Sequence, residues 1–240
     1  MKKNGFYEFF SGGGMARAGL SDYWECIFSN DFDEKKCQAY KVNWSSNHLI
    51  VDDIKNITVK QLPKTAELSW ASFPCQDLSL AGNGEGLNAG RSGTFWDYWS
   101  IMKALNQESR APNLIVLENV IGALTSHVGE DFRCIVRALN SEGYIVGAVV
   151  IDAAHFLPQS RPRLFIVGVK DHLKIPPMLV HTNPVAPWHT KSMISAINAL
   201  SNKEKLKWRW FTLPIPSDRT LVLSDIIEDK PQGVVRIASN

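Results

Sequence analysis

The chain has 240 residues, of which 45% are hydrophobic and 21% are charged, a composition that is typical of a globular protein and argues against disorder. This length is enough for one sizeable α/β domain with an appendage. The formal net charge of +2 permits a polyanionic partner but does not by itself indicate one.

The four cysteines, Cys26, Cys37, Cys75 and Cys134, are scattered without Cys-x-x-Cys pairs or histidines at ligand spacing. We therefore expect neither a metal site nor a disulfide framework, and a reducing, cytoplasmic setting fits best. No run of about 18 apolar residues occurs, so the sequence predicts neither a membrane span nor a signal peptide.

Residues 6–10 are rich in aromatics and predict a strand that runs directly into Ser11-Gly12-Gly13-Gly14, and residues 15–20 predict a helix. Glycines let the backbone approach a ligand closely, and the free N–H groups at a helix start suit a carboxylate or phosphate. A simple tight connection would have the same pattern. The turn is not G-x-G-x-x-G, which counts against a dinucleotide.

Acids follow the next two predicted strands. The strand over residues 24–30 delivers Asp31 about nineteen residues after Gly12, near the spacing at which an acid accepts ribose hydroxyls in related folds. Alternatively, Asp31 caps the helix predicted over residues 33–43. The strand over residues 48–51 ends at Asp52 and Asp53, which would otherwise be solvated turn residues.

The strand predicted over residues 67–73 ends at Pro74, which lacks an N–H and so tips the chain into a loop at Cys75. A thiol at the carboxyl end of a strand faces the crevice where open α/β sheets bind ligands. The alternative is a cysteine that packs as a small hydrophobe. A long, polar, glycine-rich segment follows to residue 93, and residues 94–106 predict a helix.

Residues 114–117 predict a buried strand that ends in Glu118-Asn119-Val120. Five predicted strands thus point ligand-type groups to one rim, which indicates an active site there. Glu118 alone could instead cap the following turn.

A helix over residues 131–140 and strands over residues 144–151 and 164–169 complete the predicted core. The second of these strands is preceded by Leu157-Pro158-Gln159-Ser160-Arg161-Pro162-Arg163. Its two arginines alternate along an extended chain, a pattern that would otherwise mark a solvated face.

Beyond residue 170 the sequence is linker-like, with a short helix predicted over residues 192–200. In residues 205–211, basic side chains alternate with aromatic ones. We interpret this stretch as an amphipathic surface segment rather than as a nucleic-acid contact. We interpret four histidines that show no ligand spacing as structural: His155, His172, His181 and His189.

In order, S-F-P-C-Q, a Gly-rich segment with R-S-G, L-E-N-V and P-Q-S-R-P-R resemble the motif set of the DNA (cytosine-5) methyltransferases, from about Phe6 to Gly168. The resemblance implies an α/β fold with a Rossmann-like, S-adenosylmethionine-dependent methyltransferase sheet flanked by helices. It implies a catalytic domain over residues 1–170, followed over residues 171–240 by a linker and the start of a DNA-recognition region.

The resemblance also implies roles for individual residues. The catalytic residues would be Cys75, Glu118, Arg161 and Arg163. The S-adenosylmethionine ligands would be Phe10, Ser11, Gly12, Gly14, Met15, Asp31, Phe32, Asp53, Ile54 and Pro74. The DNA contacts would be Gln76, Ser79 and Arg91.

By this resemblance Cys75 adds to a flipped-out cytosine of duplex DNA, in a bacterial or phage restriction-modification setting. Relatives continue with a recognition domain, so we expect either a catalytic half completed by a second subunit or a truncated product. The alternatives are methylation of cytosine in transfer RNA and a catalytically silent, cofactor-binding subunit.

Overall fold

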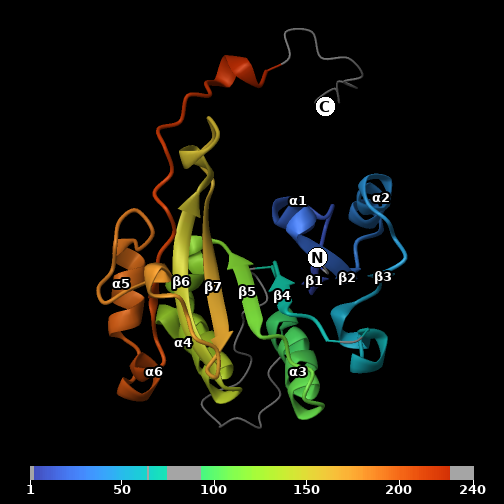
Figure 1. The fold of residues 1–240 in the computed structure, drawn as a ribbon, viewed down its shortest axis with the longest axis horizontal. Coiled ribbons are helices and arrows are strands. Elements are labelled where there is room, and N and C mark those ends of the chain that lie inside the picture. Colours follow the sequence, from blue (N-terminus) through green and yellow to red (C-terminus); the bar gives the residue numbers. More distant parts are fainter. Residues whose placement is uncertain (1–2, 64, 75–92, 228–240) are drawn as a thin grey trace.

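The computed structural model describes residues 3–63, 65–74 and 93–227 (Figure 1). Within them lies a seven-stranded sheet of order β3-β2-β1-β4-β5-β7-β6. Its strands are β1 (Asn4–Phe9), β2 (Trp24–Asp31), β3 (Leu49–Val51), β4 (Leu68–Ala71), β5 (Leu114–Asn119), β6 (Tyr144–Asp152) and β7 (Pro162–Lys170). Strands β1 to β5 are mutually parallel, whereas β7 runs antiparallel to both of its neighbours, β5 and β6.

Helices flank this sheet, as the sequence predicts. Figure 1 shows α1 and α2 at the β1–β2–β3 end, and α4, α5 and α6 at the β6 end. The helices are α1 (Met15–Leu20), α2 (Glu34–Asn43), α3 (Thr94–Gln107), α4 (Glu130–Ser141), α5 (Lys191–Asn198) and α6 (Asn202–Leu206). None of those described is long and apolar enough to cross a membrane.

Strand β1 shows how the two faces of the sheet are filled. Tyr7 and Phe9 are fully buried in the main core cluster, which also contains side chains of α3, α4 and α5. Phe6 and Glu8 alternate with them and therefore point to the opposite face, where α1 begins. Burial of an aromatic ring such as that of Phe9 contributes about 1.5–3 kcal/mol.

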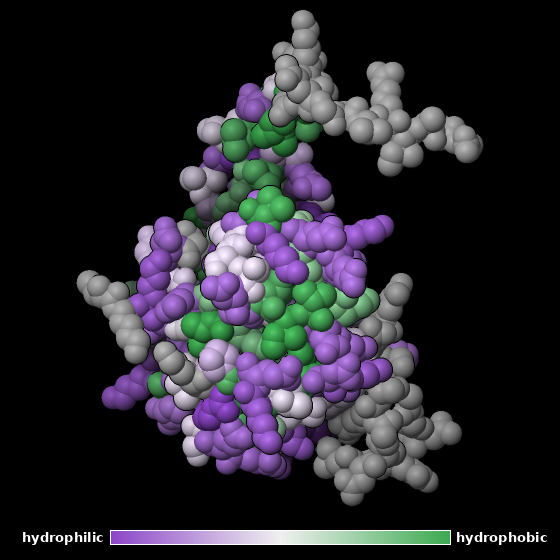
Figure 2. Space-filling model, turned by 90° about the vertical axis from the view of Figure 1, so that its right-hand side faces the viewer, coloured by the Kyte–Doolittle hydropathy of each residue, from purple (hydrophilic) through white to green (hydrophobic). Residues whose placement is uncertain are grey.

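Figure 2 views the molecule from the side that lies on the right in Figure 1, where strand β3 ends the sheet. Apolar side chains gather in the middle of this face, and hydrophilic ones surround them. The three residues of β3 are half-buried.

The opposite edge strand, β6, is covered by residues 188–211. The N–H and C=O of Val146 bond to Lys207 O and Arg209 N at 2.9 and 2.8 Å, and the N–H of Val150 bonds to Trp188 O at 2.8 Å. These contacts satisfy an edge that would otherwise present unpaired backbone groups. Four apolar side chains of the segment join the main core: Met193, Ile197, Leu200 and Trp208.

The aromatics of residues 205–211 face this edge. Trp208 and Phe211 are buried, while Lys205 is exposed. The amphipathic interpretation is therefore confirmed, and these two rings are not available to stack on bases. The division at residue 170 stays a prediction.

Several predicted boundaries differ from those observed by one or two residues, and two of these differences lie next to predicted site residues. Strand β4 ends at Ala71, because it is paired with β1 and β5 over only four residues. Strand β7 begins at Pro162, so Arg163 lies inside a strand rather than before one.

Candidate active site

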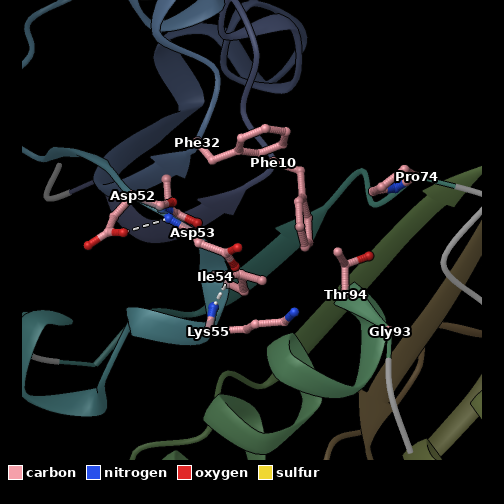
Figure 3. A pocket seen from close by; sticks show the side chains of 10 residues that line it. Phe10, Phe32, Asp52, Asp53, Ile54, Lys55, Pro74, Gly93 and Thr94 are labelled. Carbon is pink, nitrogen blue, oxygen red and sulfur yellow. Dashed lines mark hydrogen bonds between the residues drawn. The ribbon is translucent and has the colours of Figure 1, made fainter.

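The carboxyl ends of the parallel strands meet at one edge of the sheet, as the sequence predicts, and two cavities lie along this edge. The larger, of about 820 Å³, is lined by the turn after β1, by Asp31 at the end of β2, and by Trp70, Glu118 and Arg161. The smaller, of about 430 Å³, is drawn in Figure 3. The side chains around it include Phe10, Phe32, Asp53, Ile54 and Pro74.

The turn after β1 is tightly wound. Ser11 N bonds to Asn30 O at 3.0 Å, and Gly14 N bonds to Ser11 O at 2.8 Å. Phe10 has a φ of 56°, which is unusual for a residue with a side chain and is found at ligand sites. At Gly14, whose φ is 83°, a Cβ would lie only 2.3 Å from Trp44 Nε1, so the packing there requires glycine.

Asp31 ties the turn after β1 to the end of β2. Its Oδ2 accepts from Gly12 N at 2.8 Å, and its Oδ1 accepts from Asp33 N at 2.9 Å. The side chain that caps α2 is that of Asp33, which accepts from Lys35 N and Lys36 N. The alternative that Asp31 caps this helix is therefore wrong. Asp31 is buried and held by backbone donors, with its carboxylate on the larger cavity.

The loop after β3 is fixed from β2. Asn30 is buried, and its Nδ2 donates to Ile50 O at 3.1 Å and to Asp52 O at 2.9 Å. Asp53 caps the short turn that follows by accepting from Lys55 N at 3.0 Å. Ile54 is buried beneath it and presents an apolar wall to the smaller cavity.

Glu8 is a buried acid beneath the turn after β1. Its Oε1 accepts from Arg17 N at 3.2 Å, while its buried Oε2 has no hydrogen-bond partner among the residues that the structure describes. Burial raises the pKa of Glu8 to about 7, against the opposing effect of the Arg17 N–H. Ser11 lines the same cavity, and its buried Oγ likewise has no partner in residues 3–63, 65–74 and 93–227. Two unsatisfied polar groups beside one cavity indicate a polar ligand.

Glu118 and Arg163 form an ion pair on the same edge. Arg163 Nε lies 3.0 Å from Glu118 Oε1, and both side chains are about three-quarters buried. The pair depends on the antiparallel register, which places Glu118 opposite Phe165 and thus beside Arg163 two residues away on the same face.

The turn after β5 is secured by Asn119 rather than by Glu118. Asn119 Nδ2 donates to Phe73 O at 3.1 Å, and its Oδ1 accepts from Val120 N at 2.8 Å. The alternative that Glu118 caps this turn is therefore wrong. Among the described residues, the Arg161 side chain has no polar partner, and it lines the larger cavity with Glu118.

Most of the residues expected at the site are brought together. Those that line a cavity are Phe10, Ser11, Gly12, Met15, Asp31, Phe32, Asp53, Ile54, Pro74, Glu118 and Arg161. Gly14 lines neither cavity, and Arg163 enters the site through its pair with Glu118. Four predicted residues lie outside the described residues: Cys75, Gln76, Ser79 and Arg91.

Sequence reasoning missed several residues of the cavity walls: Glu8, Lys55, Trp70 and Phe165. Of these four, only Glu8 could have been recognised from the sequence. It is an acid within a run of aromatic residues, and buried acids are rare unless they have a partner or a function. The arrangement as a whole suits a nucleoside with a polar tail, since aromatic and apolar walls alternate with carboxylates near the glycine turn.

The model of the C-5 cytosine-specific DNA methylase family matches residues 5–234. Type II methyltransferase M.BsuFI of Bacillus subtilis is 37% identical over 172 residues, which cover 71% of this chain and 40% of that protein. Type II methyltransferase M.Bsp6I of Bacillus sp. (strain RFL6) is 33% identical over 167 residues, 68% of this chain and 51% of that protein. The chain thus spans about half the length of the curated relatives it matches.

Solved structures share the fold. The S. pombe Dnmt2 methyltransferase superposes with a TM-score of 0.58 at 22% identity, covering 72% of this chain and 53% of that one. The Entamoeba histolytica methyltransferase EhMeth gives 0.51 at 19% identity, covering 77% and 62%. Together with the mostly parallel sheet, these likenesses confirm the predicted methyltransferase fold.

Proposed function

The chain belongs to the C-5 cytosine-specific DNA methylase family, and on this premise we propose that it transfers a methyl group from S-adenosylmethionine to carbon 5 of a flipped-out cytosine in duplex DNA. The observation that carries the proposal is the Glu118–Arg163 pair, which lies on the catalytic edge beside the larger cavity. Curated relatives named type II methyltransferases support a restriction-modification setting.

Enzymes of this family and fold take the methyl group from S-adenosylmethionine, and the cavity walls fit that cofactor. Asp31 would accept the ribose hydroxyls, and Phe10 and Phe32 would enclose the adenine with Asp53, Ile54 and Pro74. The methionine end would lie at Ser11, Gly12 and Met15, where it would form a hydrogen bond with the buried Ser11 Oγ. Gly14 supports the turn by its packing against Trp44. Bound there, the cofactor supplies an electrophilic methyl group.

Carbon 5 of cytosine is too weak a nucleophile to take a methyl group directly, so covalent catalysis is needed. The Cys75 thiolate adds to carbon 6, and the electron pair gained by the ring makes carbon 5 nucleophilic. After methyl transfer, a water molecule takes the proton of carbon 5, the electron pair of that C–H bond restores the double bond between carbons 5 and 6, and the Cys75 thiolate is expelled from carbon 6. The target base must first leave the duplex stack, at a cost of about a few kcal/mol.

Glu118 would stabilise the adduct through ring nitrogen 3, and Arg163 would hold Glu118 in place. Arg163 holds Oε1 of Glu118 at 3.0 Å, so Oε2 remains to hydrogen-bond ring nitrogen 3 through a shared proton as negative charge builds up on the ring. Arg161, on the cavity wall without a polar side-chain partner in the described structure, would contact the base or its phosphate. Gln76, Ser79 and Arg91 would contact the DNA around the flipped base.

Covalent trapping tests the proposal. Purified chain, S-adenosylmethionine and duplex DNA that contains 5-fluorocytosine are run on a denaturing gel beside the Cys75→Ser variant, because fluorine blocks the proton loss that releases the thiol. We expect a shifted band with the wild type and none with Cys75→Ser, whose affinity for S-adenosylhomocysteine should stay within about threefold.

Three other outcomes would change the proposal. A band with fluorocytosine in transfer RNA and not in duplex DNA would overturn the substrate. A band that requires a second protein would identify a separate recognition subunit as part of the enzyme. Cofactor binding with no band on either nucleic acid, with or without such a protein, would indicate a silent cofactor-binding subunit and refute the activity.

A further inference from the structure

The tip of the hairpin between β6 and β7 is closed by one carboxylate. Figure 1 shows this hairpin extending beyond the carboxyl ends of the parallel strands. Asp152, the last residue of β6, accepts from Ala154 N at 3.0 Å and from Arg161 N at 2.7 Å through Oδ1, and from Ser160 Oγ at 2.9 Å through Oδ2. A single side chain thus binds both ends of the nine-residue stretch that connects the two strands.

The end of the β6–β7 hairpin lacks a backbone hydrogen bond because a proline stands opposite Asp152. Asp152 lies opposite Pro162 in the strand register, and proline has no N–H to donate to the ladder. The next backbone bond, from Ala153 N to Arg161 O, is long at 3.4 Å. The Asp152 carboxylate replaces the missing backbone contact with a charge-assisted one.

The hydrogen bond from Arg161 N to Asp152 fixes the backbone of Arg161, a residue of the candidate active site. Arg161 receives no polar side-chain contact from the described residues, yet its side chain lines the cavity with Glu118. Within the described part of the chain, the N–H of Arg161 is held by the Asp152 carboxylate alone. Arg163, by contrast, is held directly by Glu118 and by the O of its neighbour Pro162 at 2.9 Å.

We propose that Asp152 is a positioning residue that aims Arg161 at the phosphate backbone of the nucleic acid beside the target base. This inference rests on the proposed function for the identity of the ligand, and on the geometry of the tip for the role of Asp152. The hydrogen bond from Ala154 N, followed by those from Arg161 N and Ser160, lowers the pKa of Asp152, so its charge is kept. Without the carboxylate, the tip would sample many conformations and Arg161 would lose its fixed direction.

The first test measures amide hydrogen exchange over residues 153–161 in the wild type and in Asp152→Ala. We expect the amides of Ala154 and Arg161 to be protected in the wild type and to exchange at least about tenfold faster in the variant. Asp152→Asn should restore most of the protection, because an amide oxygen can accept both N–H groups. Amides that are equally unprotected in wild type and Asp152→Ala would overturn the proposal.

The second test measures binding to a mixed-sequence DNA duplex as a function of salt. Asp152→Ala should bind about tenfold more weakly and lower the salt slope by about one, as Arg161→Ala does. The double variant should bind no more weakly than Arg161→Ala alone, because Asp152 acts through Arg161. A role in folding alone would leave the salt slope unchanged and would add its effect to that of Arg161→Ala.

Asp171→Ala is the matched control. Asp171 follows the other end of β7 and pairs with Lys207 at 3.2 Å, so its removal changes the net charge by the same amount without touching the tip. Loss of a negative charge should by itself strengthen DNA binding slightly. Equal affinities of Asp152→Ala and Asp171→Ala would overturn the proposal. If the wild type binds no duplex DNA, either alone or with a second recognition protein, the proposed function fails, and the exchange measurement alone decides whether Asp152 holds Arg161.

Discussion

The two halves of the sheet deliver their polar groups to the site in different ways. In the parallel half, from β3 to β5, each group lies at or just after the end of a strand, as Asp31, Asp53 and Glu118 do. In the β6–β7 hairpin, Arg163 lies within a strand and reaches Glu118 across an antiparallel pair. Arg161 precedes the strand and is held by a side chain from the opposite arm.

This difference has a physical origin. Parallel strands joined by crossovers bring all their carboxyl ends to one edge, so any polar residue placed there joins the site. An antiparallel hairpin has no such edge, and its contribution depends on the register with β5, where a shift by one residue would turn Arg163 to the other face. The parallel half should therefore tolerate local changes that the hairpin does not.

The largest expected effect comes from removal of the contact that joins the halves. Arg163→Ala leaves Glu118 without the one ionic partner it has among the described residues and should lower the rate of methyl transfer by about 100–1,000-fold. Arg163 lines neither cavity, so the affinity for S-adenosylhomocysteine should stay within about twofold. Single-turnover kinetics and calorimetric titration measure the two quantities separately.

Arg163→Lys is the control for this prediction. Lysine keeps the charge but not the Nε–H that lies 3.0 Å from Glu118, so an intermediate rate is expected. A rate in Arg163→Ala equal to that of the wild type would show that the hairpin does not contribute to catalysis. If Arg163→Ala also lost affinity for S-adenosylhomocysteine, the hairpin would contribute to cofactor binding as well as to catalysis.

The sequence was sufficient to predict much of the parallel half. The glycine turn, the acid at Asp31 and the five converging strand ends follow from local patterns and from one spacing rule. The contact of Asp31 with Gly12 N confirms that the predicted turn and the predicted acid belong to one site.

What could not be predicted depends on contacts between distant residues. The Glu118–Arg163 pair joins positions far apart in the chain, and no local pattern encodes the register between β5 and β7. The same holds for the bond from Asn30 to Asp52 O and for the closure of the tip by Asp152. The sequence favoured an amphipathic surface segment over residues 205–211, but the strand that this segment covers, β6, is known only from the tertiary structure.

A second prediction concerns the acid hidden in the parallel half. Burial raises the pKa of Glu8 from 4.5 to about 7. Below pH 4.5 the acid is protonated in both states; between pH 4.5 and 7 only the unfolded state ionises, so the free energy of unfolding falls over that range. The loss should be on the order of 3 kcal/mol and complete above pH 7.

Glu8→Gln, which mimics the protonated acid, should lack this loss. Urea unfolding at pH 4.5 and pH 8 should give similar stabilities for the two proteins at the lower pH and a more stable variant at the higher one. Glu25→Gln, on the exposed side of the adjacent strand β2, is the control and should follow the wild type at both values. A wild type that matches Glu8→Gln at pH 8 would contradict the raised pKa.

The smallest expected effect separates two neighbouring acids within the parallel half. Asp31 accepts from Gly12 N and Asp33 N, whereas Asp33 caps α2. Asp31→Asn keeps the shape but exchanges one acceptor oxygen for a donor, so it should weaken the binding of S-adenosylhomocysteine about tenfold. Asp33→Asn should leave the affinity within about twofold, because asparagine caps helices as well as aspartate does. Calorimetric titration measures both.

The pair of variants is informative because the two residues share a loop, a charge and a side-chain size. A loss that depends only on net charge would appear equally in both, whereas a loss in Asp31→Asn alone requires the carboxylate that faces the cavity. Equal affinities would mean that the acid after β2 serves only to hold the Gly12 turn. In that case the parallel half would bind its ligand through shape and backbone, and the spacing between glycine and acid would be a structural rule rather than a ligand-binding one.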